Sequence, residues 1–111
     1  MVSSIMLKLV FFSLLFLAIA LEVVGDIFLK KWSLGGKSVL MAIGFMLYVV
    51  ASLFWAFSLK YEYLSKAISI FTVLNLICVV LVGVLMFEEK LSLVNIIGMV
   101  LGLVSVVLVQ I

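Results

Sequence analysis

Four long apolar stretches divide the chain, and this pattern restricts its fold more than any single motif does. A bilayer core about 30 Å thick is crossed by about 20 residues of α-helix. The stretches have that length, and the polar segments between them are short. They cover approximately residues 5–29, 38–59, 64–87 and 91–110.

The composition agrees with a fold that lies almost entirely within a membrane. Hydrophobic residues make up 69% of the sequence and charged residues only 11%, too few to cover the surface of a soluble core of this length. Because the connecting segments are short, consecutive helices must be antiparallel neighbours. We therefore predict an all-α membrane protein in which residues 1–111 form one domain of four transmembrane helices.

The lysines say little about the orientation of these helices in the membrane. All seven cationic residues are lysines, and orientation normally follows their imbalance between the two sides. One side carries Lys30, Lys31, Lys37 and Lys90, and the other carries Lys8, Lys60 and Lys66. This near balance leaves two interpretations open: insertion in both orientations, or a single orientation that Lys30 and Lys31 determine.

Glu22 lies deep inside the first apolar stretch, in the segment LAIALEVVGD. It is about 10 Å from the Leu29 end of the expected helix, too far for a short side chain to reach water easily. A carboxylate at this depth is costly unless it faces protein or a water-filled cavity. Because loss of water penalises the charged form, such a carboxyl can exchange a proton for a cation near physiological pH.

Other interpretations of the acidic residues stay open. Glu22 can form a buried ion pair with Lys66, but Lys66 also has Glu62 four residues away as a local partner. Asp26 lies nearer the helix end and has Lys30 at the same spacing, as an interfacial residue would. Alternatively, Asp26 shares a helical face with Glu22, and two carboxylates on one face suit a substrate with more than one positive charge.

These residues resemble the first helix of the small multidrug resistance family, whose members have about this length, four helices and a membrane-embedded glutamate. In LAIALEVVGDIFLK, Glu22, Gly25 and Lys30 match the family pattern at its spacing. The segment FEEKLSLVNIIGMVLGLVSVVLV is similar to the family's third loop and fourth helix, and Tyr48 falls where the family has a binding-site tyrosine. The resemblance implies a proton-coupled antiporter in the cytoplasmic membrane of a prokaryote, which exports small or hydrophobic cations.

The third apolar stretch departs from that family pattern. Ile68 and Phe71 stand where the family has a tyrosine and a tryptophan that face the substrate, and residues 72–75 replace a glycine-rich hinge. Asn75 either restores part of the lost polarity or holds two helices together by a hydrogen bond. The residues predicted to bind protons or substrate are Glu22, Asp26, Tyr48, Phe71 and Asn75.

The fourth apolar stretch carries small residues at helical spacing. Gly98 and Gly102 form a small-xxx-small pair, and Ser105 extends the stripe by about one turn. The stripe lets another helix approach closely, from the same chain or from a second copy. The resemblance favours a homodimer through these residues, and the lysine balance allows it to be antiparallel. Two Glu22 side chains around one chamber cannot both ionise easily, so protons and cations would compete for them. If the dimer opens alternately to the two sides of the membrane, this competition exchanges protons for cations.

Other classes of function lack the residues they need. The sequence has no histidine for a catalytic triad or a metal cluster, no phosphate-binding glycine loop and no basic stripe for nucleic acid. Cys78 is the only cysteine and is interpreted as a packing residue. We expect no enzyme activity, cofactor, metal or nucleic-acid partner. The expected partners are the lipid bilayer, a small cationic substrate and protons.

Three hypotheses from different classes remain. The first is the proton-coupled exporter of cations. The second is a translocase for a lipid-linked polar group, in which an apolar third helix suits an acyl or prenyl chain. The third is a small membrane subunit without transport of its own, with Glu22 in an ion pair.

Overall fold

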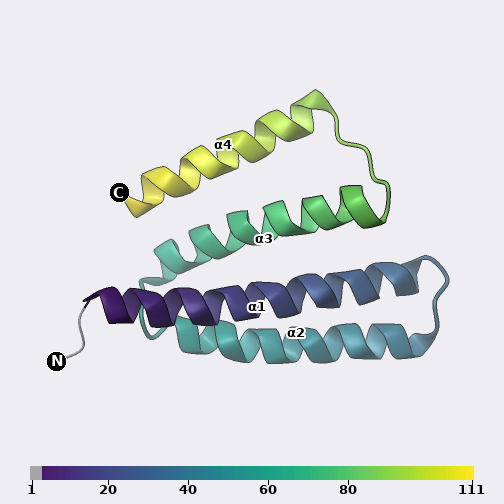
Figure 1. Ribbon diagram of the computed structural model, residues 1–111, viewed down its shortest axis with the longest axis horizontal. Coiled ribbons are helices and arrows are strands. Elements are labelled where there is room, and N and C mark those ends of the chain that lie inside the picture. The colour runs from purple at the N-terminus through teal and green to yellow at the C-terminus, as the bar shows by residue number, and fades with distance from the viewer. Residues whose placement is uncertain (1–3) are drawn as a thin grey trace. The chain divides into compact units, whose positions relative to one another are not determined.

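A computed structural model describes residues 4–111, and the fold is helical (Figure 1). Its helices are α1 (Ser4–Ser33), α2 (Ser38–Ser58), α3 (Leu64–Met86) and α4 (Leu93–Gln110). All four are long enough and apolar enough to cross a membrane, and no strand occurs in the described residues. The predicted all-α membrane fold with four transmembrane helices is therefore confirmed.

The first helix is longer than the sequence pattern predicts. α1 continues to Ser33, about one turn past the expected end at residue 29. Lys30 and Lys31 lie in its last turn, where positive charge is favoured by the negative end of the helix dipole. This extension places Glu22 about three turns from the carboxyl end of the helix, one turn more than predicted.

A glycine turn joins α1 to α2. Gly35 has a φ of 97°, in the left-handed region that favours glycine. The N–H groups of Gly35 and Gly36 donate to the carbonyl oxygen of Trp32 at 3.0 and 3.1 Å, so the chain turns while the end of α1 keeps hydrogen-bond partners. The short turn makes α1 and α2 antiparallel neighbours.

The last helix begins two residues later than predicted, because Ser92 caps it. The Asn95 N–H donates to Ser92 Oγ at 3.2 Å, and the Ser92 N–H donates to the side-chain oxygen of Asn95 at 3.1 Å. This reciprocal capping box stabilises the first turn of α4 and leaves Leu91 in the preceding loop.

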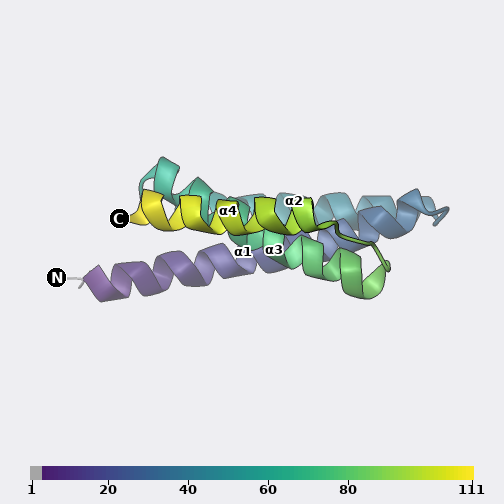
Figure 2. The ribbon, with the colours of Figure 1, turned by 90° about the horizontal axis from the view of Figure 1, so that it is seen from above.

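The chain forms two compact units, each made of one pair of neighbouring helices. Unit 1 ends at Tyr63 and contains α1 and α2; unit 2 is Leu64–Ile111 and contains α3 and α4. In unit 1 the two helices lie side by side (Figure 1), and in Figure 2 their ribbons converge toward the turn that joins them. The prediction that residues 1–111 act as a single domain stays a prediction.

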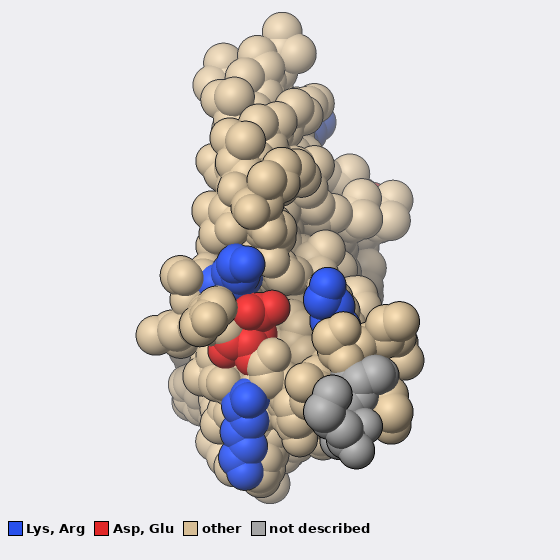
Figure 3. Space-filling model, turned by 90° about the vertical axis from the view of Figure 1, so that its left-hand side faces the viewer, with Lys and Arg blue, Asp and Glu red and all other residues tan. Residues whose placement is uncertain are grey.

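Within unit 2, α3 and α4 are closest where the chain ends. Gln110 Nε2 donates to the carbonyl oxygen of Lys66 at 3.1 Å, and the helices separate toward the loop that joins them (Figure 1). Uncharged residues make up most of the molecular face shown in Figure 3, as expected for a chain in contact with lipid.

Candidate functional site

Two glycines allow the close contact between α1 and α2. A Cβ atom on Gly25 would lie 2.7 Å from Tyr48 Cδ1 and 3.1 Å from the carbonyl oxygen of Gly44. A Cβ atom on Gly44 would lie 2.8 Å from Leu29 Cγ. Because Cβ contacts below 3.0 Å require a neighbour to shift, a larger residue at either position would disturb the pair. The glycines thus let the ring of Tyr48 lie directly against the backbone of α1.

Tyr48 reaches one of the two acidic residues of α1. Its hydroxyl group donates a hydrogen bond to Asp26 Oδ1, and both residues are half-buried. Gly25 precedes Asp26 in the sequence, so the residue that admits the ring is next to the carboxyl group that the ring's hydroxyl binds. The sequence placed Asp26 and Tyr48 among the residues of one predicted site, but it did not predict this contact between them.

Glu22 lies one turn before Asp26 on the same helix. Residues four apart on a helix share a face, with Cβ atoms about 5–6 Å apart. Glu22 is half-buried as well. Unit 1 therefore carries two carboxyl groups and one phenol hydroxyl group within about one turn of α1, and these groups can bind protons or cations. The described residues contain no group of three or more His, Cys, Asp or Glu side chains that could hold a metal ion.

The other two predicted site residues belong to unit 2. Phe71 and Asn75 lie about one turn apart on α3, and both are half-buried. The Asn75 side-chain oxygen is buried and has no hydrogen-bond partner among residues 4–111. Since buried polar atoms almost always have a partner, this acceptor has capacity for a donor from outside the described chain. Ile68, which replaces the family's tyrosine, is 44% exposed.

The small residues of α4 are not used for close packing within the described chain. A Cβ atom on Gly98 would meet nothing within 4 Å, and one on Gly102 would meet only Val73 Cγ2, at 3.9 Å. Gly98 and Ser105 are exposed, and α4 has no buried residue. Within the described chain, Gly98 and Ser105 are therefore open positions of the stripe, whereas Gly102 is half-buried and lies at ordinary contact distance from Val73 of α3.

A comparison with protein families identifies the kind of protein that carries these features. The family model described as Small Multidrug Resistance protein matches residues 9–102. The chain belongs to the small multidrug resistance family. Searches of curated proteins and of solved structures returned no match.

Family membership confirms the resemblance found in the sequence and the class of function it implied. Members of the small multidrug resistance family are membrane transporters rather than enzymes. With four helices able to cross a membrane, this member is an integral membrane transporter. The match includes every predicted proton- or substrate-binding residue and both α4 glycines; Ser105 lies just beyond it.

Proposed function

We propose that this member of the small multidrug resistance family exchanges protons for small or hydrophobic cations, and that Glu22 binds the proton and the cation in turn. The observation that carries the proposal is a carboxyl group about three turns inside α1, within the segment that the family model matches. A carboxylate in a membrane helix needs water, a partner or a cation beside it. Competition between proton and cation for one group couples their fluxes in opposite directions.

The other predicted site residues have distinct parts in this proposal. Asp26, held by the Tyr48 hydroxyl group, adds a second carboxyl group on the Glu22 face of α1. Phe71 offers an aromatic ring to a lipophilic cation, and Asn75 offers a buried acceptor to a polar group of the substrate.

We further propose that the transporter is a homodimer. Four short helices enclose little volume, whereas two copies can place two Glu22 side chains around one chamber. The exposed positions Gly98 and Ser105 support α4 as the contact, because small residues let helices approach closely in a membrane. The near balance of lysines between the two sides supports an antiparallel arrangement.

Replacing Glu22 by Gln tests the proposed exchange directly. Currents across solid-supported membranes would be measured with reconstituted protein, for guanidinium, quaternary ammonium and polyamine cations at two pH values. Wild-type protein should give cation-evoked currents that change with the proton gradient, and Glu22→Gln should give only the background of protein-free membranes. Glu88→Gln, in the loop before α4, is the matched control. Proton-linked currents that survive Glu22→Gln would contradict the proposal.

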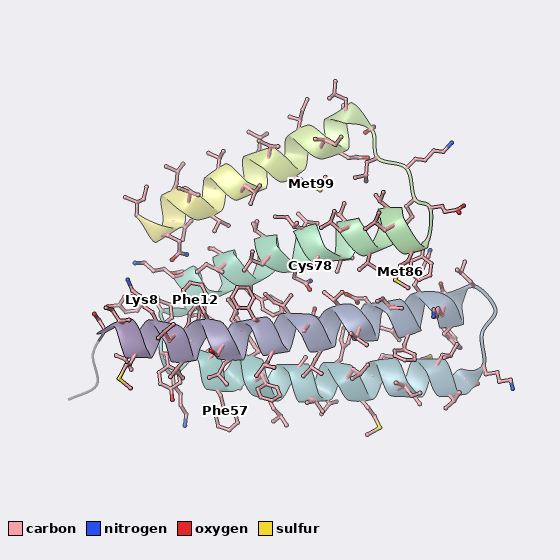
Figure 4. The ribbon with its side chains drawn as sticks, viewed as in Figure 1. Lys8, Phe12, Phe57, Cys78, Met86 and Met99 are labelled. Carbon is pink, nitrogen blue, oxygen red and sulfur yellow. The ribbon has the colours of Figure 1, made fainter. Side chains whose placement is uncertain are left out.

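One observation favours a second candidate, the translocase for a lipid-linked polar group. A groove of about 350 Å³ lies between α3 and α4, and apolar side chains from Ile77 to Leu85 and from Ile96 to Leu103 line it. Met99 points into the space between the two helices (Figure 4). Such a groove fits an acyl or prenyl chain. This candidate predicts that Glu22→Gln keeps part of the lipid movement between leaflets, measured with fluorescent lipid-linked substrates in the same liposomes.

A further inference from the structure

The loop between α2 and α3, residues 59–63, lies where the chain leaves the membrane and returns to it. Four of its residues, Lys60 to Tyr63, line a hollow of about 340 Å³. This volume falls at the lower end of the range for small-molecule sites. Because both adjoining helices can cross a membrane, the hollow lies at the level of the lipid headgroups.

Two aromatic rings border this hollow. Tyr61 is 38% exposed and Tyr63 is 74% exposed. Tyrosine side chains are favoured at the membrane surface because the ring is apolar and the hydroxyl group is polar. The face of such a ring also attracts an ammonium group.

Two opposite charges complete the hollow. The Lys60 ammonium group lies 5.3 Å from the centroid of the Phe57 ring, and Phe57 is 51% exposed and points away from α1 (Figure 4). This contact keeps Lys60 along the outer side of α2. Glu62 Oε1 accepts a hydrogen bond from the Tyr63 N–H at 2.9 Å, which holds the carboxyl group at the backbone of Tyr63. A positive and a negative side chain therefore border one hollow together with two tyrosines.

We propose that this loop binds the headgroup of a phospholipid that carries a primary ammonium group, of the phosphatidylethanolamine type. Lys60 faces the phosphate, and Glu62 with the tyrosine rings faces the ammonium group. A primary ammonium group is preferred to a quaternary one because its N–H groups can donate to the Glu62 carboxylate. The site is separate from the proposed exchange at Glu22 and does not depend on it.

Native mass spectrometry of the full chain tests this site. The protein would be extracted from vesicles of phosphatidylethanolamine, phosphatidylcholine and phosphatidylglycerol in equal amounts and with the same acyl chains, and the bound lipids would be counted by mass. The wild-type protein should retain the ethanolamine lipid in excess of the other two. Glu62→Gln should lower that excess by up to about fivefold, the range expected for an exposed ion pair. Lys60→Gln should lower retention of all three lipids.

The matched controls are Glu88→Gln and Lys90→Gln, which remove one charge of each sign from the loop before α4 and should leave the preference unchanged. Equal retention of the three lipids by the wild-type protein would overturn the proposal and leave the tyrosines as general interfacial anchors. A preference that Glu62→Gln leaves at the wild-type level would also overturn it. Soluble glycerophosphoethanolamine should bind more weakly than the lipid, and equal binding would contradict a membrane lipid as the ligand.

Discussion

Gly25, Asp26 and Tyr48 form one contact in which each residue depends on the others. The absence of a side chain at position 25 admits the tyrosine ring, and the ring brings its hydroxyl group to the carboxyl group of the next residue. A carboxyl group in an apolar helix is costly without such a partner. The contact therefore both joins α1 to α2 and determines where the second acidic side chain of α1 lies.

Replacing Tyr48 by Phe should weaken this contact without removing the ring. The variant loses only the hydrogen bond to Asp26, so its unfolding free energy should fall by about 0.6 kcal/mol, and by no more than about 1.7 kcal/mol. Unfolding by increasing SDS in mixed micelles would measure the change. In the double variant with Asp26→Ala, which removes the acceptor, the loss should be smaller than the sum of the losses in the two single variants. Strict additivity would show that the two side chains do not interact.

Gly25→Ala should have a larger effect, because the added methyl group cannot fit beside the ring. The ring would shift and carry its hydroxyl group away from Asp26, since the new Cβ atom would lie 2.7 Å from Tyr48 Cδ1. We expect a loss of about 1–3 kcal/mol in unfolding free energy and a reduced cation current in liposomes. Val24→Ala is the control, because Val24 is 42% exposed. A wild-type current from Gly25→Ala would show that transport does not need this contact.

At the scale of the elements, α3 is followed by a glutamate at a position where many helices have a glycine. The N–H groups of Phe87 and Glu89 both donate to the carbonyl oxygen of Gly83 at 3.1 Å. Between them, Glu88 has a φ of 55°, in the left-handed region where glycine is usual after a helix. A Cβ atom on Gly83 would collide with the Glu89 carboxyl group, so glycine at 83 makes room for the Glu89 side chain over the helix end.

Glu88→Gly should therefore stabilise the protein. The left-handed conformation costs an ordinary residue about 1–2 kcal/mol, and the greater backbone entropy of glycine offsets about 0.5–1 kcal/mol of that gain. The expected net increase in unfolding free energy lies between about 0 and 1.5 kcal/mol, measured by SDS unfolding. Glu88→Ala removes the same charge but keeps the Cβ atom, so it should unfold like the wild-type protein. A gain of the same size in Glu88→Ala would assign the effect to charge rather than to the backbone.

At the scale of the whole molecule, the two units carry different parts of the proposed transporter. Unit 1 holds Glu22 and the Asp26–Tyr48 contact, and unit 2 holds the buried oxygen of Asn75 and the stripe of α4. Gly98 has no close neighbour within the described chain, and Gly102 lies at ordinary contact distance only from Val73. The proposed homodimer gives the α4 stripe a partner.

Gly98→Leu tests the dimer without disturbing the described chain. Nothing lies within 4 Å of a Cβ atom at this position, so the fold should be unchanged. The larger side chain should nevertheless prevent close approach of a second α4. Energy transfer between labelled copies in liposomes should fall at a given protein-to-lipid ratio. Val107 lies on the side of α4 opposite Gly98, so Val107→Leu is the control and should show the same energy transfer as the wild-type protein. Wild-type energy transfer in Gly98→Leu would show that α4 is not the interface.

The sequence by itself determined the membrane class, the number and order of the helices, the family and the acidic residues to be examined. These follow from local properties, namely the length of each apolar stretch and the spacing of a few residues along the chain. The tertiary structure alone decided that Asp26 meets Tyr48, that Gly25 and Gly44 bring α1 and α2 together, and that Gly98 of the α4 stripe has no close neighbour within the described chain. Helices that are apolar on nearly every side have no marked hydrophobic face, so their periodicity does not specify which side turns toward a neighbour. That choice depends on contacts between residues far apart in the sequence.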